Sequence, residues 1–142
     1  MPIVTPDVAS DVATRAVALL PDDWFLSGAR RNVWVGLERT AAGAVPLLAL
    51  FALAAGERHA IHSDGQTREL DVQLLIRCER DKWDDGWARA RRLYDALHLS
   101  GPFDVGAVSY IDIRAFDAPA PLPGDGNDPH YFALNVSAWY DG

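Results

Sequence analysis

The sequence predicts one α+β domain, in which a mainly antiparallel sheet of four to five strands carries an N-terminal helix and a second helix packed on one face. Three observations support this fold. Residues 68–80 and 131–140 alternate between apolar and polar side chains, as half-buried strands do. Residues 8–20 and 82–99 repeat their apolar side chains at helical spacing. The connections are mostly typical of hairpins, which join antiparallel strands.

The length and composition fit a single globular domain. The chain has 142 residues, of which 49% are hydrophobic and 23% are charged. The net charge of −7 argues against a protein that wraps duplex DNA, because phosphate binding depends on lysine and arginine. The single cysteine, Cys78, excludes a disulfide within the chain and a cysteine metal cluster.

No segment has the pattern of a membrane span or a secretory signal. The uncharged residues 40–56 are interrupted by Gly43 and Pro46 and fall short of the roughly 20 apolar residues that a span needs. The first residues lack the basic start and apolar block of a signal peptide. We therefore expect a soluble, intracellular protein with no membrane partner.

The N-terminal helix is expected to start at Thr5, Pro6 and Asp7. Thr5 can cap the helix, Pro6 suits its first position, and Asp7 complements the positive end of the helix dipole. Pro21 ends the helix. The apolar stripe comprises Val8, Val12, Ala16, Leu19 and Leu20.

A linker over residues 21–31 follows this helix. It contains an exposed-looking aromatic pair, Trp24 and Phe25, and a basic pair, Arg30 and Arg31. The aromatic pair fits an interface anchor and a cover over the end of the core equally well.

The next two apolar segments differ in clarity. Residues 32–38 alternate enough to form a strand, with residues 41–46 as its turn. Residues 47–54 are ambiguous, because leucine and alanine favour a helix, whereas a short segment that is apolar on both faces also fits a central strand. The residues alone leave both interpretations open.

The polar residues 57–67 contain Ser63, Asp64 and Gly65, a hairpin signal. They lead into residues 68–80, the clearest strand of the chain. Its apolar face comprises Leu70, Val72, Leu74, Ile76 and Cys78. A slip of one residue would expose that whole face, so the register should be firmly set. Cys78 is therefore interpreted as a small core residue and not as a nucleophile.

The second helix is expected over residues 82–99, capped by Asp81 and ended by Gly101 and Pro102. Its apolar stripe comprises Trp83, Trp87, Ala90, Tyr94 and Leu97. Gly86 in the middle of a helix costs about 1 kcal/mol relative to alanine. We therefore expect a close neighbour to pack against Gly86.

The face opposite the tryptophans carries Arg89, Arg91 and Arg92. These arginines fit a contact with nucleic acid or with an acidic partner. A solvated helix face, balanced by nearby aspartates, is the favoured interpretation.

Two more strands complete the predicted sheet. Residues 106–117 are expected to place Ile111 and Ile113 inward and Tyr110, Asp112 and Arg114 outward. The apolar face of residues 131–140 comprises Phe132, Leu134, Val136, Ala138 and Tyr140. The proline-rich residues 118–129 between them are expected to form a stiff, exposed loop.

No catalytic residue, metal or cofactor is expected, since the sequence lacks a nucleophile elbow, a phosphate-binding loop and a zinc-binding helix motif. His59 and His62 have no further ligand nearby in sequence, which favours solvated histidines over a metal site. Asp125 and Asp128 lie in a loop without the glycine and distal glutamate of a calcium-binding loop, which favours a polar turn.

The order of the elements and several local motifs resemble a known family. The motifs are DVQLLIR at 71–77, LYDAL at 93–97, IDIR at 111–114, PLPGD at 121–125 and YFALNV at 131–136. Together, over about residues 5–140, they resemble the tail terminator (tail-completion, or minor capsid) family of long-tailed bacteriophages and gene-transfer particles. The loop over residues 124–129 is longer and more acidic than the family pattern.

This resemblance implies a structural virion protein and not an enzyme. Family membership implies a ring, typically of six subunits, at the head-proximal end of the tail tube, assembled in the host cytoplasm. The ring stops tube polymerisation and presents a surface to the head-side connector, while DNA passes through its lumen without specific binding. The resemblance also implies that residues 47–54 form a strand.

The residues expected to contact neighbouring subunits or partners are Trp24, Phe25, Arg30, Arg31, His59, His62, Asp64, Arg89, Arg92, Asp125 and Asp128. Two other interpretations stay open. One is a neck or head-completion protein on the portal side. The other is a small enzyme or ligand-binding domain with Tyr110, Asp112 and Arg114 as its site.

Overall fold

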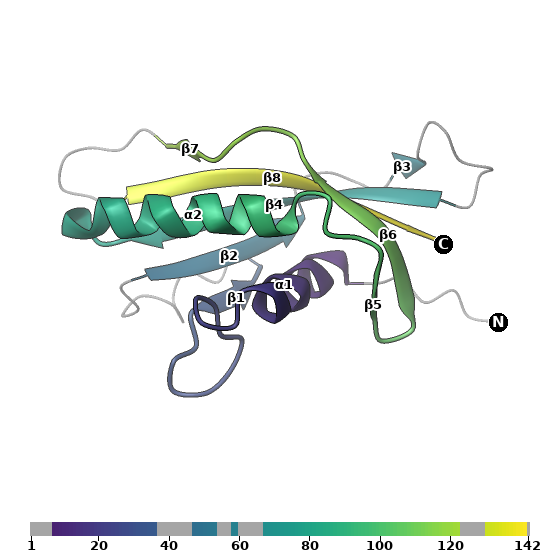
Figure 1. Ribbon diagram of the computed structural model, residues 1–142, viewed down its shortest axis with the longest axis horizontal. Coiled ribbons are helices and arrows are strands. Elements are labelled where there is room, and N and C mark those ends of the chain that lie inside the picture. The colour runs from purple at the N-terminus through teal and green to yellow at the C-terminus, as the bar shows by residue number, and fades with distance from the viewer. Residues whose placement is uncertain (1–6, 37–46, 54–57, 60–66, 123–129, 142) are drawn as a thin grey trace.

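The computed structural model describes residues 7–36, 47–53, 58–59, 67–122 and 130–141 (Figure 1). The two α-helices are α1 (Val8–Leu19) and α2 (Trp83–Leu97), and a short 3₁₀ turn over Arg80–Lys82 precedes α2. The strands are β1 (Val33–Val35), β2 (Leu47–Leu53), β3 (Arg58–His59), β4 (Thr67–Cys78), β5 (Phe103–Val105), β6 (Val108–Ala115), β7 (Ala120–Pro121) and β8 (His130–Asp141).

All of these strands belong to one sheet, in the order β1-β2-β4-β8-β6-β5, with β3 paired to β4 and β7 paired to β8. Every pairing is antiparallel except that of β1 with β2. Both helices lie on the same face of the sheet (Figure 1). This arrangement confirms the predicted α+β class.

The centre of the sheet is the long pair β4 and β8, whose register runs from Thr67 opposite Asp141 to Cys78 opposite His130. Both predicted alternations are confirmed, because every second residue of each strand is buried under the helices. These residues are Leu70, Val72, Leu74, Ile76, Cys78, Phe132, Leu134, Val136, Ala138 and Tyr140. Shifting either strand by one residue would expose five of them, so burial sets the register.

Residues 47–53 form the strand β2, in agreement with the family resemblance. The predicted hairpin with the preceding strand is wrong, because β1 and β2 run parallel, with Val33 opposite Ala49 and Val35 opposite Phe51. A tight hairpin turn joins only antiparallel strands. The local turn composition did not distinguish a hairpin from another kind of connection. The predicted turn over residues 41–46 lies outside the described residues.

The facing predicted for β6 is wrong at two positions. Tyr110 is buried and Ile111 is 42% exposed, the reverse of the expectation, whereas Ile113 is buried as predicted. The pairing with β8 moves from Tyr110 opposite Tyr140 to Asp112 opposite Trp139, so β6 carries one extra residue at this point. Such a bulge reverses the alternation of the strand, and a strict period of two does not foresee it.

The helices begin and end close to their predicted positions, with different caps. Asp7 caps α1 by accepting a hydrogen bond from the Ser10 N–H at 3.1 Å, while Thr5 lies outside the described residues. Asp81 does not cap α2, because it lies inside the 3₁₀ turn and the residue at the cap is Lys82. Neither α1 nor α2 is long and apolar enough to span a membrane, within the part of the chain that the structure describes.

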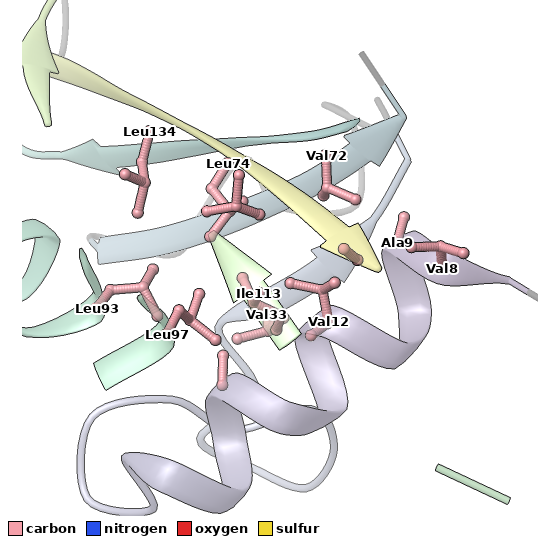
Figure 2. Close-up of a cluster of buried hydrophobic side chains, with 14 of the residues drawn as sticks. Val8, Ala9, Val12, Val33, Val72, Leu74, Leu93, Leu97, Ile113 and Leu134 are labelled. Atoms are coloured by element: carbon pink, nitrogen blue, oxygen red, sulfur yellow. The ribbon is translucent and has the colours of Figure 1, made fainter. Parts of the chain in front are cut away.

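The core lies between the helices and the sheet, as Figure 2 shows for Val12 of α1, Leu93 and Leu97 of α2, and Leu74 of β4. The predicted close packing at Gly86 is confirmed. A Cβ atom at Gly86 would lie 2.6 Å from the Cys78 Sγ and 2.9 Å from a ring carbon of Phe132. The glycine therefore lets α2 approach β4 and β8 more closely than any larger residue would.

The segment after α2 lies along the outer side of β6. The Leu99 N–H donates to the Ile113 carbonyl at 2.7 Å, and the Gly101 N–H donates to Asp112 Oδ1 at 3.0 Å. His98 Nδ1 accepts a hydrogen bond from the Ala115 N–H at 3.0 Å. β5 then continues along the same side of β6, a strand that the sequence did not reveal because it has three residues.

Candidate functional site

The linker between α1 and β1 carries four of the predicted contact residues, and Asn32 holds its shape. Asn32 is buried, its Oδ1 accepts from the Phe25 N–H at 2.8 Å, and its Nδ2 donates to the Asp23 carbonyl at 2.9 Å. The Phe25 carbonyl in turn accepts from the N–H groups of Asn32 and Val33. The linker is therefore an ordered loop that returns the chain to the sheet.

This loop places Trp24 in the core and leaves the arginines outside. Trp24 is 1% exposed and belongs to the core, although the surrounding sequence suggests an exposed residue. Its burial supports the interpretation that it covers the end of the core. Phe25 is half-buried. Arg30 and Arg31 are exposed, with their guanidinium carbons 6.0 Å from the ring centre of Phe25 and 4.8 Å from that of Trp34, respectively.

Two of the three arginines on α2 bind the same loop. Arg92 binds the Asp23 carboxylate through two nitrogens, at 2.8 and 3.2 Å. Arg89 donates to the Asp23 carbonyl at 3.0 Å, and its guanidinium lies 5.9 Å from the Trp24 ring centre. The hydrogen bond with Asp23 raises the pKa of Arg92. The sequence did not reveal Asp23 as the partner, since 66 to 69 positions separate it from the arginines.

A double-mutant cycle should measure this contact. For Asp23→Ala and Arg92→Ala we expect a coupling free energy of about 0.5–1 kcal/mol, because the pair is bidentate but the Arg92 side chain is half exposed. Urea unfolding of the two single variants and the double variant gives this energy. The control cycle of Asp23→Ala with Arg91→Ala should show coupling near zero, and equal coupling in both cycles would contradict a specific contact.

A second polar contact, which is partly buried, joins α1 to β6. The Tyr110 hydroxyl donates to the Asp11 carboxylate, and one turn later in the helix Arg15 donates to the Ser100 carbonyl. The Arg15 guanidinium also lies 4.5 Å from the ring centre of Phe103. Burial raises the pKa of Asp11, and burial together with the hydrogen bond to Asp11 raises the pKa of Tyr110.

The raised pKa values of Tyr110 and Cys78 predict a loss of stability in alkali. Burial raises the pKa of Tyr110 above its ordinary 10.0 and that of Cys78 above its ordinary 9.0. The folded chain therefore keeps protons that the unfolded chain releases, so the stability they confer is complete below pH 9 and falls as the pH rises above 9 to 10. Urea unfolding between pH 8 and 11 should show this decline.

The variant Tyr110→Phe isolates the tyrosine part of this effect. Above pH 10 its free energy of unfolding should fall less steeply than that of the wild type, by up to about 1.4 kcal/mol per pH unit. Between pH 7 and 8 the free energies of unfolding of the two proteins should change with pH at the same rate. Identical slopes above pH 10 would contradict the assignment to Tyr110.

The site considered for a small enzyme or binding domain is not assembled as predicted. Tyr110 faces the helices and is buried, whereas Asp112 accepts from the backbone N–H groups of Gly101 and Ile113. Arg114 lies 5.0 Å from the ring centre of Trp139 and 4.0 Å from Asp112. The three side chains therefore do not converge on one position.

The remaining predicted contact residues come from the two segments that the sequence predicts to be a hairpin and an exposed loop. His59 lies in β3, paired with Arg68 of β4, which fits the hairpin expected over residues 57–67. His62, Asp64, Asp125 and Asp128 lie outside the described residues. Along the described chain, no three histidine, cysteine, aspartate or glutamate side chains gather closely enough to hold a metal ion.

The predicted loop over residues 118–129 begins as part of the sheet. Ala120 and Pro121 form β7, opposite Ala133 and Phe132 of β8. The Leu122 N–H extends this contact by donating to the Tyr131 carbonyl at 2.8 Å. The start of the loop is therefore fixed to the central strand.

Comparison with known proteins places the fold. No protein-family model matches the chain, and no curated protein matches its sequence. Among solved structures, the fold matches a chain from the virion of a native gene transfer agent particle. The two chains are 14% identical, and the match covers 97% of this chain and 100% of that chain with a TM-score of 0.64. This protein therefore has the fold of a chain found in a gene transfer agent virion, over nearly its whole length.

Proposed function

We propose that this protein is a structural component of a phage-like or gene-transfer particle, and that it acts as the tail terminator. In this role, copies of the chain form a ring at the head-proximal end of the tail tube, stop tube polymerisation and provide the surface that joins the head. The observation that carries the proposal is the full-length fold match to a chain of a gene transfer agent virion. The motifs that resemble the tail terminator family support the proposed position within the particle.

The charge of the chain suits a passage for DNA. Each copy carries a net charge of −7, so a ring of six would carry about −42. Proteins grip DNA by neutralising phosphates with lysine and arginine, which releases counterions. An acidic ring makes few such contacts, so DNA passes through the lumen without being held. The hairpin over residues 57–67 and the loop over residues 118–129 are the proposed surfaces toward the tail tube and the head-side connector.

Deletion of the gene in the strain that produces the particle tests this function. Without a terminator, tube subunits continue to add, so we expect tails of uncontrolled length that do not join heads. Electron microscopy of the particles measures both properties. Tails of normal length joined to heads would contradict the proposal.

The position of the protein distinguishes the terminator from a neck protein. A tagged copy of the full chain, labelled with gold and viewed by electron microscopy, should mark the head-proximal end of isolated tails. Label on isolated heads, with tails unmarked, would contradict a terminator and support a head-completion protein.

A further inference from the structure

Two exposed patches of opposite charge lie at separate places in the described part of the chain. The acidic corner comprises Asp81, Trp83, Asp84 and Asp85, at the start of α2, and the exposed Lys82 lies between Asp81 and Trp83. The basic pair comprises Arg30 and Arg31, at the end of the loop that precedes β1. None of the ion pairs among the described residues involves either patch. The Arg31 Nε donates to the Val33 carbonyl at 3.4 Å, and Asp85 lies within electrostatic reach of Arg92. Both patches are nevertheless exposed, so their remaining polar groups can meet another molecule.

The acidic corner combines charge with an exposed aromatic ring. Its three aspartates are exposed, and Trp83 is 37% exposed although it is apolar. The indole is held in place by stacking on Trp87 at 5.7 Å and by an edge contact with Phe132 at 5.4 Å between ring centres. Carboxylates at the start of a helix stabilise the helix dipole, but that role does not account for an exposed indole beside them.

The basic pair is ordered before it meets any partner. Arg31 stacks on Trp34 and Arg30 on Phe25, and the loop that carries them is fixed by the hydrogen bonds of Asn32. Because the Arg31 Nε donates to the Val33 carbonyl, the two terminal nitrogens of Arg31 are the ones left for a carboxylate. An ordered side chain also loses less conformational entropy on binding. In contrast, Arg92 already has its carboxylate partner in Asp23.

We infer that the basic pair of one copy binds the acidic corner of the next copy. Guanidinium groups bind carboxylates through paired hydrogen bonds and also bind the face of a tryptophan. The basic pair can therefore contact both the aspartates and the exposed Trp83 of the acidic corner. Because the two patches differ, the contact is head-to-tail, and repetition of such a contact makes a ring or a filament. That the contact closes into a ring rests on the proposed function. The new inference is which two surfaces join neighbouring subunits.

Charge reversal in the purified full-length protein tests the pairing. Reversal of the basic pair with Arg30→Glu and Arg31→Glu, or of the acidic corner with Asp81→Arg and Asp85→Arg, should weaken self-association about tenfold or more, measured by sedimentation velocity at low salt. All four changes in one chain should restore association to near the wild-type level. Arg91→Glu is the matched control, since Arg91 is an exposed arginine stacked on Tyr94 outside both patches, and it should associate like the wild type.

Disulfide trapping gives a second measurement that does not depend on strong association. A chain with Arg31→Cys and Asp84→Cys should form a ladder of oligomers under mild oxidation at high protein concentration, whereas each single variant should stop at the dimer. The native Cys78 is buried and stays unreactive. The control pair Arg91→Cys and Asp84→Cys should give no ladder. Absence of a ladder in the test pair, or failure of the fourfold reversal to restore association, would overturn the inference.

The failure of this inference is separable from failure of the proposed function. If the charge-reversed chains restore normal tails in the deletion strain, the terminator function stands and the pairing of these two patches is wrong. If the deletion strain already makes normal tails, the terminator function is wrong whatever the trapping experiment shows.

Discussion

Replacing Trp24 with alanine is expected to lower the free energy of unfolding by about 3–5 kcal/mol, the range for removing a large aromatic side chain from a core. Trp24 is 1% exposed and belongs to the main core cluster. Its ring also lies 5.9 Å from the Arg89 guanidinium, which would lose this contact. Urea unfolding followed by circular dichroism measures the change.

The neighbouring arginine provides the control for this prediction. Arg30 is exposed in the same loop, so Arg30→Ala should change the free energy of unfolding by less than about 0.5 kcal/mol. The two variants separate a core role from an interface role. A Trp24→Ala protein with wild-type stability and impaired assembly would contradict the core placement and would restore Trp24 as an interface anchor.

Replacing Gly86 with alanine should destabilise the protein by about 1–3 kcal/mol, although alanine is the better helix former by about 1 kcal/mol. The added Cβ would lie 2.6 Å from the Cys78 Sγ and 2.9 Å from Phe132. These contacts force α2 away from the sheet, and the cost of that movement exceeds the gain in helix propensity. Thermal unfolding or urea unfolding shows which effect is larger.

Two further variants locate the origin of this effect. Asp95→Ala, on an exposed position of the same helix, should leave the stability within about 0.5 kcal/mol of the wild type. Adding Cys78→Ala to Gly86→Ala should recover part of the loss, because it removes the closest atom. A Gly86→Ala protein more stable than the wild type would show that α2 moves without cost.

The sequence is most informative where burial is periodic and local. β4 and β8 are predicted with the correct facing because one face of each is buried along most of its length. The packing at Gly86 is also predictable, since a glycine within a helix has a known cost that some contact must offset. The helical spacing of residues 8–20 likewise locates α1, of which Val12 and Ala16 lie in the core.

Contacts between distant segments are not visible in the sequence. Nothing near Asp23 indicates that it binds Arg92, and nothing near Asp11 indicates the hydroxyl of Tyr110. The bulge in β6 depends on its pairing with β8, so the exposure of Ile111 follows from tertiary structure. Of the predicted contact residues, the structure places Trp24 in the core, and the interface roles of the others stay predictions.

The hydrogen bonds along the outer strands have a consequence for pairing between sheets of different molecules. The open side of β6 is already bonded by His98, Leu99 and β5, and the Val33 N–H of β1 is bonded by the Phe25 carbonyl. A strand with unpaired backbone groups recruits strands of other molecules, whereas short and bonded edges do not. In the described part of the chain, these contacts leave fewer unpaired backbone groups on β6 and β1 to pair with a strand of another molecule.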